Sequence, residues 1–150
     1  MRTARAGAAV PLSPAAALEL WRDVERWPSF VEGFARRLEL SPDWPAEGAR
    51  VVWESSPDGR GRVTETVVEY ETDRFSTQVF EEALMGTQTL RVAPAPDGAE
   101  VELTLDYELA KYGPLAGLAD AIFIRRALRD ALRRTLFRFG VEAEEEAELR

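Results

Sequence analysis

The sequence contains no histidine and no cysteine, and its only lysine is Lys111. These absences exclude Ser–His and Cys–His nucleophile pairs, zinc sites built from the usual ligands, iron–sulfur clusters and disulfide bonds. Any proton transfer would have to use carboxylates, tyrosines, arginines or the single lysine. We therefore expect no metal ion or other cofactor, and we expect a binding protein rather than an enzyme.

Long hydrophobic runs are also missing. No stretch approaches the length needed to span a bilayer, and the ten residues ahead of Pro11 are too short and too weakly apolar for a signal peptide. We expect a soluble, cytoplasmic protein. The net charge of −8 argues against nucleic acid as the main partner, because phosphate contacts need a basic surface. A chain of 150 residues that is 45% apolar suits one domain over residues 1–150 with a sizeable core.

Two short helices are predicted near the N-terminus, after a first strand at residues 3–10. Ser13 can cap free amides and Pro14 fits a first helical position, so we expect a helix over Pro14–Arg22. Trp27 should be extended, because the ring of the following proline disfavours the helical region. A second short helix from Pro28 would pack the next apolar side chains on a sheet: Phe30, Val31 and Phe34.

From about residue 35 the apolar residues recur every second position, which predicts an antiparallel sheet. Gly86 inside a strand suggests a bulge or a close backbone approach. In the last strand the apolar side chains alternate with charged ones, so one face of the sheet is solvated. The expected strands are Arg36–Leu40, Arg50–Ser55, Arg62–Tyr70, Arg74–Phe80, Gly86–Val92 and Val101–Leu109.

A long helix is expected after a break at Tyr112-Gly113-Pro114, roughly over Leu115 to Glu146. Its apolar residues recur at helical spacing and need a partner surface, so the helix should lie on the apolar face of the sheet. This stripe consists of Leu118, Ala121, Ile122, Ile124, Leu128, Ala131, Leu132, Leu136 and Phe139.

The order of elements resembles the START/Bet v1-like helix-grip proteins, in particular the polyketide cyclase/dehydrase-like branch of the SRPBCC superfamily. The resemblance implies an α+β fold in which a curved antiparallel sheet of about seven strands wraps around the long C-terminal helix, with two short helices after strand 1. Such proteins bind lipids, sterols, polyketides, hormones or aromatic compounds between sheet and helix, and a minority are cyclases, aromatases or dehydratases. The residues that carry the resemblance are Leu18–Trp21, Asp23 with Trp27-Pro28, Gly48–Trp53, Val63–Tyr70, Gly86–Leu90, Gly98–Leu103 and the last helix.

A hydrophobic small molecule (a lipid, a polyketide or an aromatic compound) is therefore the expected partner. Apolar walls with a few polar groups are typical of such sites, and Gln88, Thr77 and Tyr107 are the polar candidates. Strand alternation predicts the sheet side of the cavity, and the stripe predicts the helix side. The expected wall consists of Leu38, Leu40, Trp53, Phe75, Thr77, Val79, Gln88, Leu90, Leu103, Leu105, Tyr107, Leu118, Ile122 and Phe123.

Two alternatives remain open. In a cyclase or aromatase, Tyr107 could act as the acid with Arg62 as an oxyanion partner, while Glu54 and Glu65 are expected on the solvent face.

In an interaction protein, the arginines of the long helix could dock an acidic partner, anionic lipid headgroups or ribosomal RNA; we favour instead a solvated face paired with carboxylates, such as Arg138 with Glu142. Arg126, Arg129 and Arg133 share one exposed side. A homodimer is compatible with the sequence, which does not define the oligomeric state. The arginines of the long helix are Arg125, Arg126, Arg129, Arg133, Arg134 and Arg138.

Overall fold

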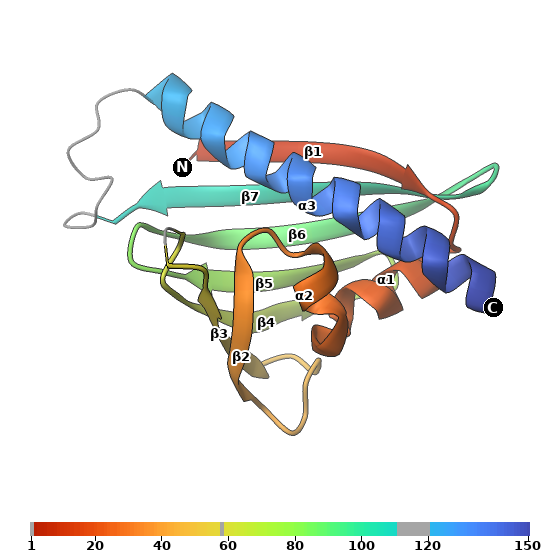
Figure 1. The fold of residues 1–150 in the computed structure, drawn as a ribbon, viewed down its shortest axis with the longest axis horizontal. Helices are drawn as coiled ribbons and strands as arrows, with labels where there is room; N and C mark the ends of the chain where they lie inside the picture. Colours follow the sequence, from red (N-terminus) through yellow and green to blue (C-terminus); the bar gives the residue numbers. More distant parts are fainter. Residues whose placement is uncertain (1, 58, 111–120) are drawn as a thin grey trace.

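The computed structural model describes residues 2–57, 59–110 and 121–150, which form one antiparallel sheet of seven strands with helices on one face (Figure 1). The strand order is β1-β7-β6-β5-β4-β3-β2. The strands are β1 (Arg2–Val10), β2 (Phe34–Leu40), β3 (Arg50–Ser55), β4 (Arg62–Tyr70), β5 (Arg74–Phe80), β6 (Leu84–Ala95) and β7 (Gly98–Leu109). The helices are α1 (Pro14–Arg22), a 3-10 turn η1 (Val24–Arg26), α2 (Trp27–Phe30) and α3 (Ala121–Leu149).

The sheet curves around α3, which confirms the predicted helix-grip α+β fold. β1 pairs with β7, with Arg2 opposite Tyr107, and α3 crosses the face of these strands (Figure 1). At the other end, β2 is inclined steeply to β1 and β7 and its register with β3 shifts twice, as bulges that increase strand twist do. None of the described helices has the length and apolar content needed to cross a membrane.

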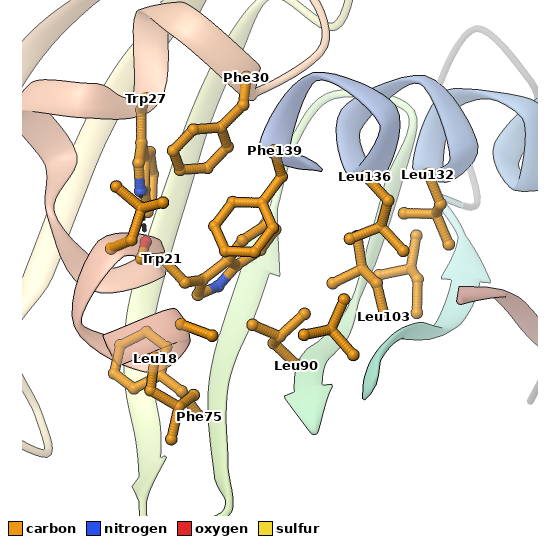
Figure 2. Packing of buried hydrophobic residues seen from close by; sticks show 14 of the residues in the cluster. Leu18, Trp21, Trp27, Phe30, Phe75, Leu90, Leu103, Leu132, Leu136 and Phe139 are labelled. Atoms are coloured by element: carbon orange, nitrogen blue, oxygen red, sulfur yellow. Dashed lines mark hydrogen bonds between the residues drawn. The ribbon is translucent and has the colours of Figure 1, made fainter. Parts of the chain in front are cut away.

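The corner between α1 and α2 differs from the sequence prediction. Trp27 is helical, with φ −57° and ψ −35°, although a proline follows it. Its indole is buried and donates from Nε1 to the Trp21 carbonyl over 2.8 Å (Figure 2). Packing and this hydrogen bond therefore override the local preference for an extended residue before proline. The second helix is also shorter than expected, because α2 ends at Phe30 and Phe34 begins β2.

An aromatic cluster joins the three helices (Figure 2). The ring of Phe139 meets those of Trp21 and Phe30 edge-on at centroid distances of 5.4 and 5.1 Å, and Trp21 stacks on Phe30 at 5.5 Å. Each such pair contributes about 0.5–1.5 kcal/mol beyond the area that it buries. This cluster holds the C-terminal half of α3 against α1 and α2.

The buried side of α3 follows helical spacing, but among the predicted members Leu128 and Ala131 are only half-buried and Ile122 is exposed. Ile122 is 65% exposed, because it lies two residues, or about 200°, from the buried Ile124 around the helix. Leu118 and the predicted break at residues 112–114 lie outside the described residues. Among the α3 side chains that the structure describes, the buried ones are Ile124, Leu132, Thr135, Leu136, Phe139 and Ala143.

Candidate functional site

A cavity of about 140 Å³ lies between α3 and the covered face of the sheet. Most of its wall is apolar, and its polar groups include two glutamates and an arginine from the β3–β5 side of the sheet. The sheet and its connections contribute Arg60, Glu65, Glu81, Leu84, Gln88 and Leu105; α3 contributes Leu128, Ala131, Leu132 and Thr135; the N-terminal helices and the following loop contribute Trp21, Trp27, Val31 and Glu32.

Glu65 is the most unusual residue of this wall, because its carboxylate is buried and only 4% of the residue is exposed. Trp53 donates from Nε1 to Glu65 Oε2, and Thr77 donates from Oγ1 to Glu65 Oε1, each over 2.8 Å. Both donors are diagonal neighbours of Glu65, one on β3 and one on β5, at a distance that long side chains bridge. The carboxylate thus has one donor for each oxygen.

The expectation that Glu65 faces solvent is wrong. Glu65 lies two residues from Val63 and from Val67, and side chains two apart share a face of a strand, so the burial of both valines already places it on the covered face. The expectation for Glu54 is confirmed: its side chain is 44% exposed and pairs with Arg36 at 2.9 Å.

An ion pair lies beside Glu65. Arg60, in the connection between β3 and β4, pairs with Glu81, in the connection between β5 and β6. The Arg60 guanidinium also lies 5.1 Å from the centre of the Trp53 ring, a distance at which a cation is attracted to the aromatic face. The side chain of Glu81 is 4% exposed and that of Arg60 is 33% exposed, so solvent reaches this group from the arginine side.

Burial raises the pKa of Glu65 above its usual value. The hydrogen bond from Trp53, the positive charge of Arg60 and the hydrogen bond from Thr77 lower it, but less than burial raises it, and the negative charge of Glu81 raises it further. A carboxyl group in this state holds its proton at a higher pH than an exposed glutamate does. The site can therefore present a hydrogen-bond donor to the cavity when Glu65 is protonated.

A second set of contacts fastens the α2–β2 connection to α3 at the edge of the cavity. The backbone N–H of Glu32 donates to Thr135 Oγ1 over 3.0 Å. The Glu32 carboxylate pairs with Arg134 at 3.0 Å and with Arg138 at 2.8 Å. The predicted pairing of Arg138 with Glu142 is therefore wrong, because Glu142 instead pairs with Arg26 at 2.7 Å.

Eight of the predicted site residues fall into three groups. Gln88 and Leu105 line the cavity. Trp53 and Thr77 lie behind the wall and hold Glu65. The third group is buried in the core and does not line the cavity: Phe75, Val79, Leu90 and Leu103.

The other predicted wall residues lie away from the cavity or outside the described residues. Ile122 and Phe123 are 65% and 62% exposed, and Leu118 is not among the described residues. A depression on the outer face of the sheet is lined by Arg62 and Leu38. Arg62 faces outward because it is one residue from the inward-facing Val63. Leu38 faces outward because β2 bulges between Arg37 and Glu39.

Tyr107 is fully buried, and its hydroxyl has no hydrogen-bond partner among the described residues. Arg62 is exposed on the opposite face of the sheet, so the structure does not place it next to Tyr107.

Sequence reasoning missed Arg60, Glu81, Glu32 and Thr135. Arg60 and Glu81 come from two different connections, and no periodicity marks a loop residue as inward. Thr135 lies on the buried stripe of α3, so its helical spacing from Leu128, Leu132 and Phe139 could have identified it. No group of three or more acidic side chains in the described ranges is arranged to hold a metal ion.

Solved structures share this fold at low sequence identity. A START superfamily protein from Mycobacterium smegmatis aligns with a TM-score of 0.76 at 13% identity, over 95% of this chain and 97% of that one. The protein TTHA0849 from Thermus thermophilus aligns at 0.75 and 18% identity, over 97% and 99%. The di-domain ARO/CYC StfQ from the steffimycin biosynthetic pathway aligns at 0.75 and 16% identity, over 97% of this chain and 51% of that one.

At these identities the structural likeness shows the fold alone. No curated protein matches the chain. The profile of the family described as "Polyketide cyclase / dehydrase and lipid transport" matches residues 1–144. The chain belongs to this family.

Proposed function

We propose that this protein binds a small hydrophobic molecule with one ring and one or two polar substituents in the cavity between α3 and the sheet. The observation that carries the proposal is the cavity itself, with its apolar wall and the buried carboxyl group of Glu65 at one side. The family description, which includes lipid transport, supports a hydrophobic ligand. Residues 1–150 would act as one domain, and the cytoplasmic location remains a prediction.

The cavity volume limits the size of the ligand. An apolar cavity of about 150 Å³ accommodates benzene, whereas pockets for drug-sized molecules measure about 300–1,000 Å³. At about 140 Å³, the cavity suits a single ring or a short branched chain. A polycyclic ligand would require α3 to move away from the sheet.

The chemistry of Glu65 defines the polar end of the ligand. Each carboxylate oxygen already accepts one hydrogen bond, and a protonated carboxyl group has one further hydrogen to donate. A ligand carbonyl would accept this hydrogen, and the amide of Gln88 in the same wall can bind a hydroxyl or a second carbonyl. Of the predicted ligand contacts, we retain Gln88 and Leu105; Trp53 and Thr77 would act by positioning Glu65.

Acid–base catalysis is a second candidate, and the burial of Glu65 favours it. A carboxyl group with a raised pKa in a cavity wall is a typical general acid. It could protonate the hydroxyl group that leaves as water in a dehydration, and the resulting carboxylate could accept the proton that the neighbouring carbon loses as the double bond forms. StfQ is an aromatase/cyclase by its name. In this proposal Glu65 replaces Tyr107 as the acid.

Native mass spectrometry of the freshly purified protein tests the binding proposal first, with identification of any molecule released on denaturation. Calorimetric titration with 4-hydroxyacetophenone then supplies one ring, a carbonyl and a hydroxyl. We expect saturable binding that Leu105→Trp abolishes by filling the cavity, while Phe80→Trp on the exposed face of β5 retains it. Equal binding by both variants would contradict the proposed site. Loss of a dehydration product in Glu65→Gln, with binding retained, would favour catalysis.

A further inference from the structure

The outward side of α3 combines basic and exposed apolar side chains. Arg126, Arg129, Arg133 and Phe137 recur three or four residues apart, so they lie along one face of the helix; we call these four residues the outer patch. Phe137 is 75% exposed, and Ile122 and Phe123, about one helical turn before Arg126, are 65% and 62% exposed. The outer patch points away from the sheet, because Leu128, Leu132 and Phe139 occupy the opposite side of the helix.

Most of the arginines on the outward side of α3 have no carboxylate partner among the described residues. Within the described residues, Arg125, Arg126 and Arg129 have no carboxylate within ion-pair distance, and Arg133 reaches Asp130 only at 3.9 Å. Arg129 is half-buried at the flank of this face, and its Nε has no hydrogen-bond acceptor among the described residues. By contrast, Arg134 and Arg138, on the side of the helix facing the α2–β2 connection, both pair with Glu32. The arginines are thus paired where α3 contacts the protein and unpaired where it faces outward.

We propose that the outer patch docks on the surface of a bilayer that contains anionic lipids. The positive charge is complementary to anionic headgroups, and each arginine near such a surface contributes to binding. Exposed phenylalanine beside arginine is the composition of helices that lie in the membrane interface. Glu144 and Glu148 continue the same face of α3 towards its C-terminal end, at helical spacing from Phe137. The proposed contact is therefore limited to residues 126–137, with α3 inclined to the bilayer so that the part nearer its N-terminus meets the headgroups.

Docking would place the ligand cavity close to the bilayer. Leu128, Ala131 and Leu132 line the cavity on the inner side of the same helical turns that carry Arg126, Arg129 and Arg133 on the outer side. An apolar ligand could then pass between bilayer and cavity over a short distance. The docking itself does not depend on the proposed ligand, so each proposal can fail independently of the other.

Flotation of the full chain with vesicles tests the proposal. Vesicles of phosphatidylcholine alone are compared with vesicles that also contain phosphatidylglycerol, at low and at raised NaCl. We expect binding only to the anionic vesicles, and we expect salt to weaken it, because the Debye length falls from about 10 Å at 0.1 M to about 3 Å at 1 M. The triple variant Arg126→Gln, Arg129→Gln and Arg133→Gln should bind roughly 100-fold more weakly, from the contribution of each arginine near an anionic surface.

A matched variant controls for net charge. Arg36→Gln, Arg50→Gln and Arg62→Gln remove the same charge from exposed positions on β2, β3 and β4 and should retain binding. Phe137→Ser, which keeps every charge, should weaken binding and distinguishes interfacial contact from attraction alone. Equal binding to neutral vesicles, or no effect of the triple variant, would overturn the proposal. So would tighter patch-dependent binding to single-stranded RNA, or a homodimer that the triple variant dissociates.

Discussion

The indole of Trp53 and the carboxylate of Glu65 form a buried hydrogen bond of 2.8 Å between β3 and β4. A carboxylate removed from water is costly unless it is paired and hydrogen-bonded. Here Trp53 and Thr77 supply one neutral donor each, and the nearest positive charge, Arg60, already pairs with Glu81. Burial therefore raises the pKa of Glu65 more than its partners lower it, and this has a measurable consequence.

The free energy of unfolding should depend on pH through Glu65. Its pKa is raised in the folded protein, so the folded state binds more protons than the unfolded state between the unfolded pKa, near 4.3, and the higher folded pKa. The stability contributed by Glu65 is complete below the unfolded value and is lost as pH rises through the folded one. The loss can reach about 1.4 kcal/mol for each pH unit between the two values.

Urea unfolding of the wild type and of Glu65→Gln, measured from pH 4 to pH 8, isolates this effect. Glutamine keeps an acceptor for Trp53 but cannot ionise, so the variant should lack this part of the pH dependence and should gain on the wild type as pH rises. Glu54→Gln, at an exposed ion pair, should follow the wild type within about 0.5 kcal/mol. Parallel pH profiles for wild type and Glu65→Gln would show that Glu65 is ionised throughout.

The fold was predictable because its signals are local and repeated. The alternation over Val101–Leu109 describes most of β7, and the spacing of Leu128, Leu132, Leu136 and Phe139 describes the buried side of α3. Each strand or helix shows this pattern over several turns or pairs, so one exception does not change the assignment. Trp27 shows the limit: its conformation depends on a hydrogen bond to Trp21, which no local pattern contains.

The site was predictable only in part. The alternation that identified Leu105 and Gln88 also places Glu65 on the covered face, beside Val63, although we expected Glu65 on the solvent face. The buried carboxylate is stabilised by two hydrogen-bond donors, Trp53 on β3 and Thr77 on β5. Their positions beside Glu65 depend on the register of the strands, which the sequence does not give. Arg60 and Glu81 are 21 residues apart in two connections, where side-chain direction follows no period. The cavity volume depends on the distance between α3 and the sheet, which composition does not determine.

Gly86 should be intolerant of any side chain. A Cβ atom at this position would lie 2.2 Å from the Asp106 carbonyl oxygen and 3.0 Å from the Tyr107 Cα, both on the neighbouring β7. The register of β6 with β7 is regular here, so the close approach rather than a bulge explains the glycine. Gly86→Ala should therefore separate two central strands and destabilise the protein by about 1–3 kcal/mol, as chemical denaturation would measure.

Gly140 provides the matched control. It lies within α3, and nothing stands within 4 Å of the position of its missing Cβ. Gly140→Ala should stabilise the protein by about 0.5–1 kcal/mol, because alanine loses less backbone entropy in a helix than glycine does. If Gly86→Ala were as stable as the wild type, the two strands would have to be further apart than the structure places them.

The contact between Glu32 and Thr135 should control local opening at the edge of the cavity. Thr135→Val keeps the shape of the side chain but removes the hydroxyl that accepts the Glu32 N–H at 3.0 Å. The amide loses its partner, at a cost of about 1–2 kcal/mol, while the ion pairs of Glu32 with Arg134 and Arg138 remain.

Hydrogen–deuterium exchange of the Glu32 amide measures this opening directly. Exchange should be roughly ten times faster in Thr135→Val, since a loss of about 1.4 kcal/mol changes an opening equilibrium tenfold. Thr135→Ser retains the hydroxyl and should keep exchange close to the wild-type rate, although it removes a methyl group from the buried stripe. Equal acceleration in both variants would assign the effect to packing of α3 rather than to the hydrogen bond. Acceleration in Thr135→Val alone, together with faster ligand release, would identify the α2–β2 connection as the part of the wall that opens.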